Sequence, residues 1–497
     1  MLTLPETEDL QAIREVFARA GYTDEGLLET LGPISLPTRA GRDLPHFLRL
    51  TRRGRPLDTL IRLFLFGVPV DIETARCVLE PVPLDQWMRA GLIAVRDGLV
   101  VAPVKLMSFR GLLLVADQPD VLEAGAQTEM VMGLTACTVA LADFTLRRPV
   151  SSALDLGTGC GVQAFLAARH SQQVWATDRG PRCLNYALFN ARLNNVANIE
   201  FLEGDTFEPV RGRRFDLVLF NTPFAISPSF RYLYRDSGLE GDQYCRRIVR
   251  EAPQYLTEGG LCQITCDWVH LAGQDWKERL AGWFEGTGCD VWVMRTDTHD
   301  AGGYAQMWVR DTEYGSSEEA ARLYEEWVSY YDREGIEAVS SGVLAMRLAG
   351  GRSNWVRIED APESMSGRVG DYVELGFELR DFLEATKDDR RLLEQRIRLS
   401  PELRLDQQCE WSEGTWRIMS AQLRLTRGLQ YVGNMDRNAV NLITRCDGRR
   451  TLREALAQLA AAVGADLEKI TPDCLTVVRQ LLERGFLLPA EHQPTAL

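Results

Sequence analysis

Between residues 109 and 312 the chain alternates short apolar runs of β-strand type with segments of helical pattern. The apolar runs are SALDLG (152–157), QVWATD (173–178), NIEFLE (198–203), FDLVLF (215–220) and LCQITC (261–266). They are apolar at odd and even positions alike, as strands are in a parallel sheet that is covered on both faces. Strands and helices that alternate in this way predict a doubly wound α/β domain with right-handed crossovers.

The end of this region carries two further β-rich runs, CDVWVMR (289–295) and YAQMWVR (304–310), joined by a turn rich in Asp and Gly. We expect them to form a terminal antiparallel pair at the edge of the parallel sheet. The predicted α/β domain therefore spans residues 109–312.

The segments on either side predict smaller modules. Residues 1–108 predict several helices and then a hairpin at Asp97 and Gly98, because Asp-Gly favours a tight turn. Residues 313–380 predict a helical and β extension, with the strand VLAMRL (343–348), and residues 381–497 end in a helix that stops at Gly485 before an apolar strand. Both terminal modules have the pattern of a winged helix, which binds nucleic acid or a protein partner or serves as inert packing.

Charge and composition restrict the possible partners. The net charge of -14 argues against a uniformly basic surface. A local run of seven arginines (Arg39, Arg42, Arg49, Arg52, Arg53, Arg55, Arg62) is typical of a solvated helical face or of an RNA contact. The 11 cysteines are scattered singly and the 5 histidines do not have metal-ligand spacing, so we predict no metal site. The absence of a leader or a long apolar run predicts a cytoplasmic protein without a membrane span.

A glycine-rich turn follows the first strand, in ALDLGTGCGVQAFLAA (153–168). Gly157, Gly159 and Gly161 allow positive φ and the close approach of a ligand, and the following helix N-terminus favours a negatively charged group. A dinucleotide fingerprint would need a glycine where this chain has Val162, which disfavours a pyrophosphate ligand.

Two acids follow the next two strands at the same predicted edge of the sheet. Asp178 ends the second strand, where a carboxylate can accept two hydrogen bonds from a ribose diol. Asp205 follows the third strand in EGDTF. Ligands of doubly wound sheets bind beyond the carboxyl ends of the strands, so these acids and the glycine turn predict one binding site.

Over about residues 125–310 these motifs resemble the class I, Rossmann-like methyltransferases that use S-adenosylmethionine, a family with a seven-stranded core and a reversed last strand. The resemblance implies that Asp155 and the three glycines wrap the methionine part of the cofactor. It also implies that Asp178 binds the ribose hydroxyls and that Asp205 lies near the adenine amine. We expect QTEMVMGLTACTVALADF (127–144) to supply the helix that closes over the cofactor.

The fourth strand ends in Asn221, Thr222, Pro223 and Phe224. The lone pair of an amide or base amine is delocalised, so an enzyme that methylates it must hold the planar group in line with the methyl donor. The Asn221 oxygen and a nearby backbone carbonyl can accept the two N–H bonds, Phe224 can stack on the plane, and Pro223 makes the turn rigid. A strand-ending turn with a buried aromatic ring is the alternative.

This stretch resembles the Asn-Pro-Pro-Phe/Tyr motif of methyltransferases that act on protein glutamine amides and on exocyclic amines of bases, with Thr222 in place of the first proline. The resemblance implies that Asn221, Pro223 and Phe224 are catalytic, that Asn221 also contacts the cofactor, and that Thr222 and Phe224 contact the substrate.

Four other residues near this edge are weaker candidates. Asp267 and Trp268 follow the fifth strand; we predict Trp268 as a substrate contact, with packing as the alternative. His299 and Asp300 lie in a loop that acts as a lid or has no chemical role. Cys160 beside the glycine turn is predicted to be a packing residue.

The leading hypothesis is an enzyme that transfers a methyl group from S-adenosylmethionine to a planar nitrogen, an amide or exocyclic amine, of RNA or of a protein or peptide. The arginine run favours RNA. The net acidity favours a protein or peptide, as does the faint similarity of the C-terminal module to peptide-binding winged helices. The alternatives are a small-molecule N- or O-methyltransferase and a non-catalytic protein that binds the cofactor.

Overall fold

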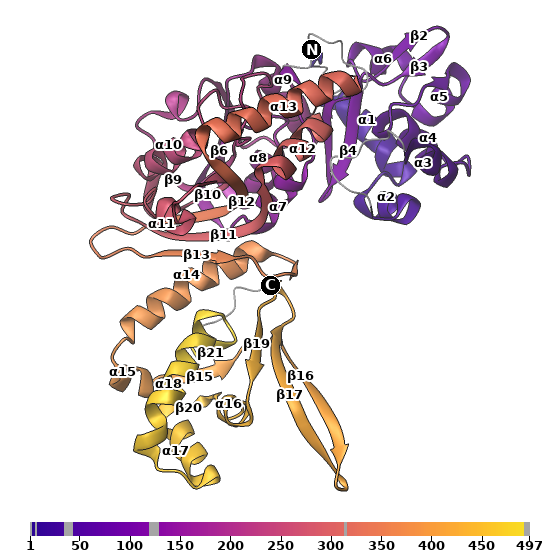
Figure 1. Cartoon of the computed structure of the whole chain (residues 1–497). Coiled ribbons are helices and arrows are strands. Elements are labelled where there is room, and N and C mark those ends of the chain that lie inside the picture. Colours follow the sequence, from indigo (N-terminus) through magenta and orange to yellow (C-terminus); the bar gives the residue numbers. More distant parts are fainter. Residues whose placement is uncertain (1, 5–6, 34–42, 119–128, 313–315, 492–497) are drawn as a thin grey trace. The chain divides into compact units, whose positions relative to one another are not determined.

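The computed structural model of the chain describes residues 2–4, 7–33, 43–118, 129–312 and 316–491 (Figure 1). It divides into two compact units, and each is described by itself. Unit 1 holds residues 1–142 and 148–360, and unit 2 holds residues 143–147 and 361–497. No helix in the described ranges is both long enough and apolar enough to cross a membrane.

Unit 1 is built around an eight-stranded sheet in the order β13-β11-β12-β10-β9-β6-β7-β8. Its strands are β6 (Val150–Leu156), β7 (Ser171–Asp178), β8 (Ile199–Glu203), β9 (Phe215–Asn221), β10 (Leu256–Leu271), β11 (Cys289–Asp300), β12 (Ile336–Leu348) and β13 (Val356–Asp360). Strands β6 to β10 pair in parallel, and β12 runs antiparallel to both β10 and β11. The predicted α/β fold with a reversed strand is confirmed, and β13 adds an eighth strand beside β11.

The central strands are buried on both faces, as their continuous apolar pattern predicts. Leu217, Val218 and Leu219 of β9 are consecutive and each is at most 1% exposed. Helices connect the strands: α7 (Ala136–Phe144), α8 (Val162–Ala168), α9 (Pro181–Leu193), α10 (Gln243–Glu251), α11 (Trp276–Ala281), α12 (Ala301–Thr312) and α13 (Ser317–Glu334). Such a sheet presents the carboxyl ends of its parallel strands along one edge, where a ligand can bind.

One predicted strand is wrong. Residues 304–310 lie in helix α12, where Tyr304, Ala305 and Val309 are the buried residues. Their spacing is that of one helix face, so the 3.6-residue period overrides the β-type composition of YAQMWVR. The reversed strand is β12, which contains the VLAMRL run, and the sheet therefore continues beyond residue 312 to Asp360.

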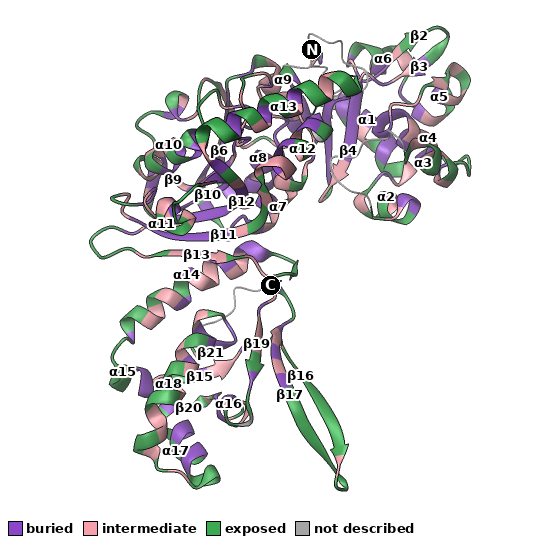
Figure 2. Cartoon of the chain, viewed as in Figure 1, coloured by how far each residue is buried: buried purple, intermediate pink, exposed green. Residues whose placement is uncertain are grey.

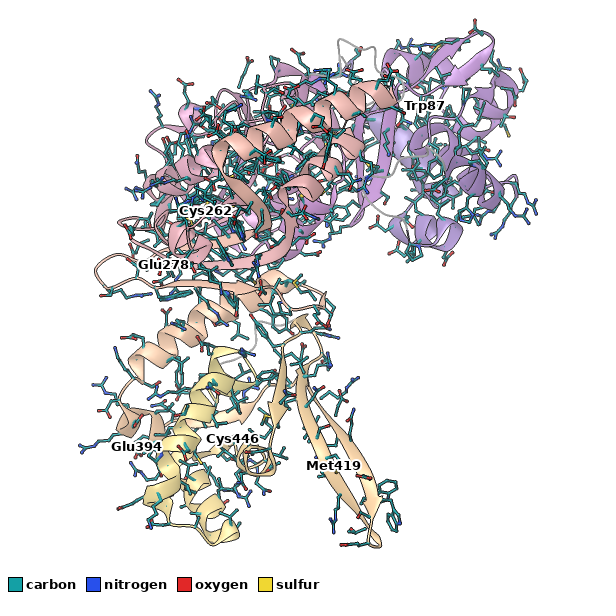
Figure 3. The ribbon with its side chains drawn as sticks, viewed as in Figure 1. Trp87, Cys262, Glu278, Glu394, Met419 and Cys446 are labelled. Atoms are coloured by element: carbon teal, nitrogen blue, oxygen red, sulfur yellow. The ribbon has the colours of Figure 1, made fainter. Side chains whose placement is uncertain are left out.

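The N-terminal part of unit 1 contains α1 (Thr7–Ala20), α2 (Asp24–Leu31), α3 (Leu44–Leu50), α4 (Pro56–Leu60), α5 (Ile72–Leu79), α6 (Leu84–Arg89), β1 (Val70–Asp71), β2 (Ala94–Arg96), β3 (Leu99–Val101), β4 (Val104–Phe109) and β5 (Leu112–Asp117). The predicted hairpin turn is confirmed, since Asp97 and Gly98 have φ of 50° and 76°. Trp87, labelled in Figure 3, packs in this module against Phe17 and Phe64. The centroid of its ring lies 5.8 Å from that of each phenylalanine.

Two asparagines at the end of helix α9 bind the edge of strand β5: Asn190 lies within the helix and Asn194 directly follows its last residue, Leu193. Asn190 accepts a hydrogen bond from Val115 N and donates to Val115 O and to Cys160 O, at 2.9 Å in each case. Asn194 repeats the arrangement with the backbone of Leu113. The two side chains therefore bond backbone groups of β5 as a neighbouring strand would. They join β5 of the N-terminal module to helix α9.

Replacing Asn190 by alanine is expected to destabilise unit 1 by about 2 to 4 kcal/mol, because buried backbone groups of Val115 and Cys160 lose their partner. Urea unfolding measures the change. Asn185→Ala is the matched control, since Asn185 lies on the same helix but binds the backbone of Leu2 in a half-exposed place. Equal destabilisation by the two substitutions would contradict the expectation.

Unit 2 contains three small sheets, in the orders β14-β18, β20-β15-β21 and β16-β17-β19, together with helices. Its elements are β14 (Met365–Ser366), α14 (Val369–Ala385), α15 (Asp389–Leu393), β15 (Arg396–Leu399), β16 (Leu403–Ser412), β17 (Thr415–Leu425), β18 (Gly428–Leu429), β19 (Val432–Met435), α16 (Arg437–Ile443), β20 (Asp447–Thr451), α17 (Leu452–Val463), α18 (Leu467–Glu483) and β21 (Leu487–Pro489). Gly485, with φ of 74°, separates α18 from β21 as predicted. Figure 2 shows that the distal part of the β16–β17 hairpin is exposed on both strands.

Candidate functional site

A cavity of about 630 Å³ lies at the carboxyl ends of β6, β7, β9 and β10. Residues 130–140, which include the start of α7, line it together with the glycine turn after β6, the segment after β9, and residues of α12. All of these elements belong to unit 1. The cavity therefore occupies the place where a doubly wound sheet binds its ligand.

The three glycines of the turn all adopt positive φ, between 55° and 94°. A Cβ atom at Gly161 would lie 2.4 Å from the ring of Phe165, and one at Gly157 would lie 2.9 Å from the ring of Phe220. At Gly159 a Cβ would meet no atom within 4 Å. The turn thus needs glycine for its backbone and for its packing, and it leaves open space toward the cavity.

Asp155 holds the glycine turn in shape. Its Oδ2 accepts hydrogen bonds from the Thr158 hydroxyl at 2.7 Å and from Ala164 N at 3.0 Å. Burial raises the pKa of this carboxyl to about 7, against the lowering effect of those two donors. Asp155 lines the cavity as predicted, and its hydrogen bonds show that it also fixes the turn from β6 into α8.

Asp178 and Asp205 lie at neighbouring strand ends on the cavity wall. The two oxygens of Asp178 accept from Gly159 N at 2.9 Å and from Gly180 N at 2.8 Å. Burial raises the pKa of Asp178, and these backbone donors oppose the shift. The Asp205 side chain is 53% exposed, with its carboxylate 3.9 Å from the guanidinium of Arg247. Two carboxylates therefore follow the glycine turn along this wall.

Asn221, the last residue of β9, lies on the same wall beside Pro223 and Phe224. Its Oδ1 accepts a hydrogen bond from the Thr265 hydroxyl at 2.6 Å, and its Nδ2 donates to the Thr138 hydroxyl at 3.4 Å. Two threonines from different elements therefore fix the plane of the Asn221 amide.

The aromatic part of the wall comes from two elements. Phe224 packs edge to face against Trp308 of α12, with 6.2 Å between the ring centroids, and both rings line the cavity. Sequence reasoning missed Trp308 because it assigned residues 304–310 to a strand. It also missed Thr138 and Thr265, because the register that places Thr265 opposite Asn221 is a property of the folded sheet.

Thr222 lines the cavity, but its hydroxyl is bonded elsewhere. The residue is 3% exposed and its Oγ1 donates to the backbone oxygen of Thr265 at 2.8 Å. A substrate contact by Thr222 therefore stays a prediction, and the observed role of its side chain is to tie the end of β9 to β10.

Trp268 is not among the residues that line the cavity, and a substrate contact by Trp268 stays a prediction. Its side chain is fully buried and packs against Trp276, with 6.2 Å between ring centroids. Successive residues of a strand point to opposite faces, and in β10 it is the preceding Asp267 that faces the cavity. Packing was the alternative interpretation of Trp268.

Of the three remaining candidates, His299 and Cys160 line the cavity and Asp300 does not. His299 lines the cavity, with its Nε2 3.1 Å from the Asp297 carboxylate. Asp300 does not line it, and instead accepts from Gly303 N at 2.6 Å in the first turn of α12. Cys160 lines the cavity as a buried thiol, and burial raises its pKa to about 12.

Asp267 makes the stability of the cofactor-free protein depend on pH. Its Oδ2 accepts from the Tyr304 hydroxyl at 2.5 Å, and burial raises its pKa from 3.8 to about 7. The folded state thus prefers the protonated carboxyl, and this contribution is full below about pH 4 and is lost as the pH rises to about 7.

We expect Asp267→Asn to reduce the decline in stability between pH 4 and pH 7, by up to about 1.4 kcal/mol per pH unit in this window. The thermal unfolding midpoint of the cofactor-free chain, measured at several pH values, tests this. Parallel curves for variant and wild type would show that another group carries the dependence; Asp155, with its own raised pKa, is the first alternative.

Three family models match different parts of the chain. Residues 149–304 match a family described as a methyltransferase domain. Residues 19–103 and 374–489 match two families that are each described as a domain of unknown function. The first match contains the glycine turn, Asp178, Asp205 and the Asn221 segment, so it covers the wall of the cavity that the strand ends supply.

Curated relatives match the same region. The release factor glutamine methyltransferase of Xylella fastidiosa is 32% identical over 171 residues, which are 32% of this chain and 55% of that protein. The ribosomal protein uL3 glutamine methyltransferase of Bradyrhizobium diazoefficiens is 36% identical over 130 residues, 23% of this chain and 41% of that protein. The chain thus spans about half the length of these relatives.

Proposed function

We propose that this chain, whose residues 149–304 are an S-adenosylmethionine-dependent methyltransferase domain, methylates the side-chain amide nitrogen of a glutamine in a protein. The observation that carries the proposal is the fixed Asn221 amide beside the glycine turn, on the wall of one cavity. The names of the relatives, which methylate glutamine in a release factor and in a ribosomal protein, agree with it.

The residues around the glycine turn fit the cofactor. The Asp178 carboxylate is at the end of β7, where it can accept from the two ribose hydroxyls, and Asp205 lies on the side expected for the adenine amine. A Cβ at Gly159 would meet no atom within 4 Å, and we propose that the methionine part of the cofactor lies beside this open side of the turn. When bound, S-adenosylmethionine supplies an electrophilic methyl group on a sulfonium.

The segment after β9 fits a planar acceptor. The Asn221 Oδ1 has one lone pair engaged by Thr265, and the other can accept one N–H of the glutamine amide. A backbone carbonyl of the segment takes the second N–H, and the ring of Phe224 covers the amide plane. Because Pro223 has a fixed φ, these groups are held before the acceptor binds.

The basic run gives less support to an RNA acceptor than its seven arginines suggest. Two arginines of the basic run have partners inside the N-terminal module. Arg55 forms an ion pair with Asp58 at 2.8 Å, and Arg62 donates to Leu48 O at 2.9 Å. Arg39 and Arg42 lie outside the described residues. A protein acceptor from the translation apparatus places the activity in the cytoplasm.

The function is tested by incubating the full chain with S-adenosylmethionine and one of three acceptors: ribosomal and translation-factor protein, total RNA, or buffer alone. We expect S-adenosylhomocysteine to form with the protein fraction only. Formation with RNA alone would replace the glutamine proposal by a base amine. Cofactor binding without turnover on any fraction would favour a non-catalytic protein.

A further inference from the structure

We infer that Thr265 is a positioning residue of the acceptor site, which sets the orientation of the Asn221 amide through its hydroxyl and anchors Thr222 through its carbonyl. The inference rests on the proposed function, because it concerns how the acceptor nitrogen is held. Thr265 belongs to β10, on the strand next to the one that carries Asn221 and Thr222.

The first part of the inference is the orientation of the amide. Thr265 lies opposite Asn221 in the parallel register of β9 and β10, and its side chain is almost fully buried. A hydroxyl can donate to Oδ1 or accept from Nδ2. The 2.6 Å contact has the length of an O–H···O bond and is shorter than the usual N–H···O bond, so it favours the amide orientation in which Oδ1 faces Thr265. Thr138 accepts from Nδ2 at 3.4 Å and favours the same orientation.

This orientation has a chemical consequence. In this orientation the Asn221 Oδ1 faces Thr265 of β10 and keeps a second lone pair for the substrate. The Asn221 Nδ2 faces Thr138 of α7. A glutamine amide brings two N–H donors, so the acceptor site needs an oxygen and not an N–H at this point. Loss of the Thr265 hydroxyl removes the group that distinguishes the two ends of the Asn221 amide.

The second part concerns Thr222, which stands where the related motif has a proline. The last ladder pair of the two strands is Asn221 with Thr265, and Thr222 lies one residue beyond it. Its hydroxyl donates to Thr265 O at 2.8 Å and so continues the attachment of the segment to β10 by one residue. A hydrogen bond between strands thus replaces the restraint that a proline ring would give.

The far end of the segment is fixed independently. Ile226 N donates to the Tyr304 hydroxyl at 3.2 Å, and the Tyr331 hydroxyl donates to Ile226 O at 2.7 Å. Pro223 and Phe224 therefore lie between two anchors. Loosening the Thr265 anchor is expected to disturb Asn221 and Thr222 while the Ile226 end stays in place.

Thr265→Val tests the role of the hydroxyl, because valine keeps the shape of threonine and removes the donor. We expect kcat with a glutamine acceptor to fall about 10- to 100-fold, with S-adenosylhomocysteine affinity unchanged, and Thr265→Ser to restore most of the rate. Thr257→Val is the matched control. Thr257 is at the other end of β10, donates to Asp216 Oδ1 at 2.8 Å, and is expected to keep the wild-type rate.

A readout without turnover separates this inference from the proposed function. The side-chain amide signals of Asn221, assigned by their loss in Asn221→Ala, are compared by ¹⁵N–¹H spectroscopy. They should shift in Thr265→Val and stay near wild type in Thr265→Ser and Thr257→Val. Wild-type protein that methylates no glutamine would contradict the proposed function, and the spectra would still decide whether Thr265 orients Asn221.

Two results would overturn the inference. One is an unchanged Asn221 amide signal in Thr265→Val. The other applies if the wild-type protein methylates glutamine: it is a shifted Asn221 signal in Thr265→Val together with an unchanged kcat of that variant. A Thr222→Val variant extends the test, because hydrogen exchange of the 221–226 backbone should become faster when the bond to Thr265 O is lost; unchanged exchange would contradict the anchoring of Thr222.

Discussion

Replacing Asn221 by alanine is expected to lower kcat by about 100- to 1,000-fold while the affinity for S-adenosylhomocysteine stays within about twofold of wild type. The variant loses the Oδ1 that accepts one N–H of the substrate amide, an interaction that must align the nitrogen with the methyl donor. We expect the cofactor to be bound chiefly by the glycine turn and by Asp178, which this substitution leaves in place.

The measurement is initial-rate kinetics with calorimetry of cofactor binding on the same preparation. Asn198→Ala is the control, because Asn198 also bonds backbone oxygens of the sheet region, Ala168 O and Ser171 O, but at the opposite edge from the cavity. Turnover that survives in Asn221→Ala would show that the acceptor nitrogen is not held by this side chain.

Replacing Asp178 by alanine is expected to weaken cofactor binding by about 1.5 to 3 kcal/mol, or about 10- to 150-fold. The variant loses charge-assisted hydrogen bonds to the ribose diol. It also loses the acceptor for Gly159 N and Gly180 N, so the glycine turn itself becomes less fixed. Both effects act in the same direction, which favours the upper half of the range.

Calorimetry with S-adenosylhomocysteine measures this loss directly. Asp216→Ala is a matched control, since Asp216 accepts from Ser151 N and Ser152 N at 3.0 Å at the amino end of the same sheet. That variant is expected to be less stable and to keep the cofactor affinity. Unchanged affinity in Asp178→Ala would refute the assignment of Asp178 to the ribose.

The strands and the ligand-binding edge were predictable because their signals are local. Runs that are apolar on both parities identify buried parallel strands, and residues that follow them must meet at one edge. Gly157, Asp178 and Asn221 were found in this way, and all three line the cavity. Their contribution to catalysis stays a prediction.

One predicted strand is wrong for a physical reason. Residues 304–310 contain β-forming side chains, but the tertiary structure buries Tyr304, Ala305 and Val309 on one helix face, so composition misled where periodicity was informative. In β10, strand parity directs Asp267 to the cavity and leaves Trp268 packed against Trp276, and the substrate contact of Trp268 stays a prediction.

The partners of Asn221 could not be read from its neighbours in sequence. Thr265 is 44 positions away and Thr138 is 83 positions away, and each comes from a different element. The same is true of Thr222, whose hydroxyl bonds the backbone oxygen of Thr265 in β10. A motif can nominate a side chain, whereas the orientation of that side chain depends on residues that only the fold brings together.

The central claim is that the methyl group goes to a glutamine amide of a protein. The direct measurement uses S-adenosylmethionine with an isotopically labelled methyl group, a fraction of translation proteins as acceptor, and tandem mass spectrometry to locate the label. We expect the label on the side-chain nitrogen of glutamine, present with wild type and Asn198→Ala and lost with Asn221→Ala. Label on any other atom, or in RNA with none on protein, would contradict the account.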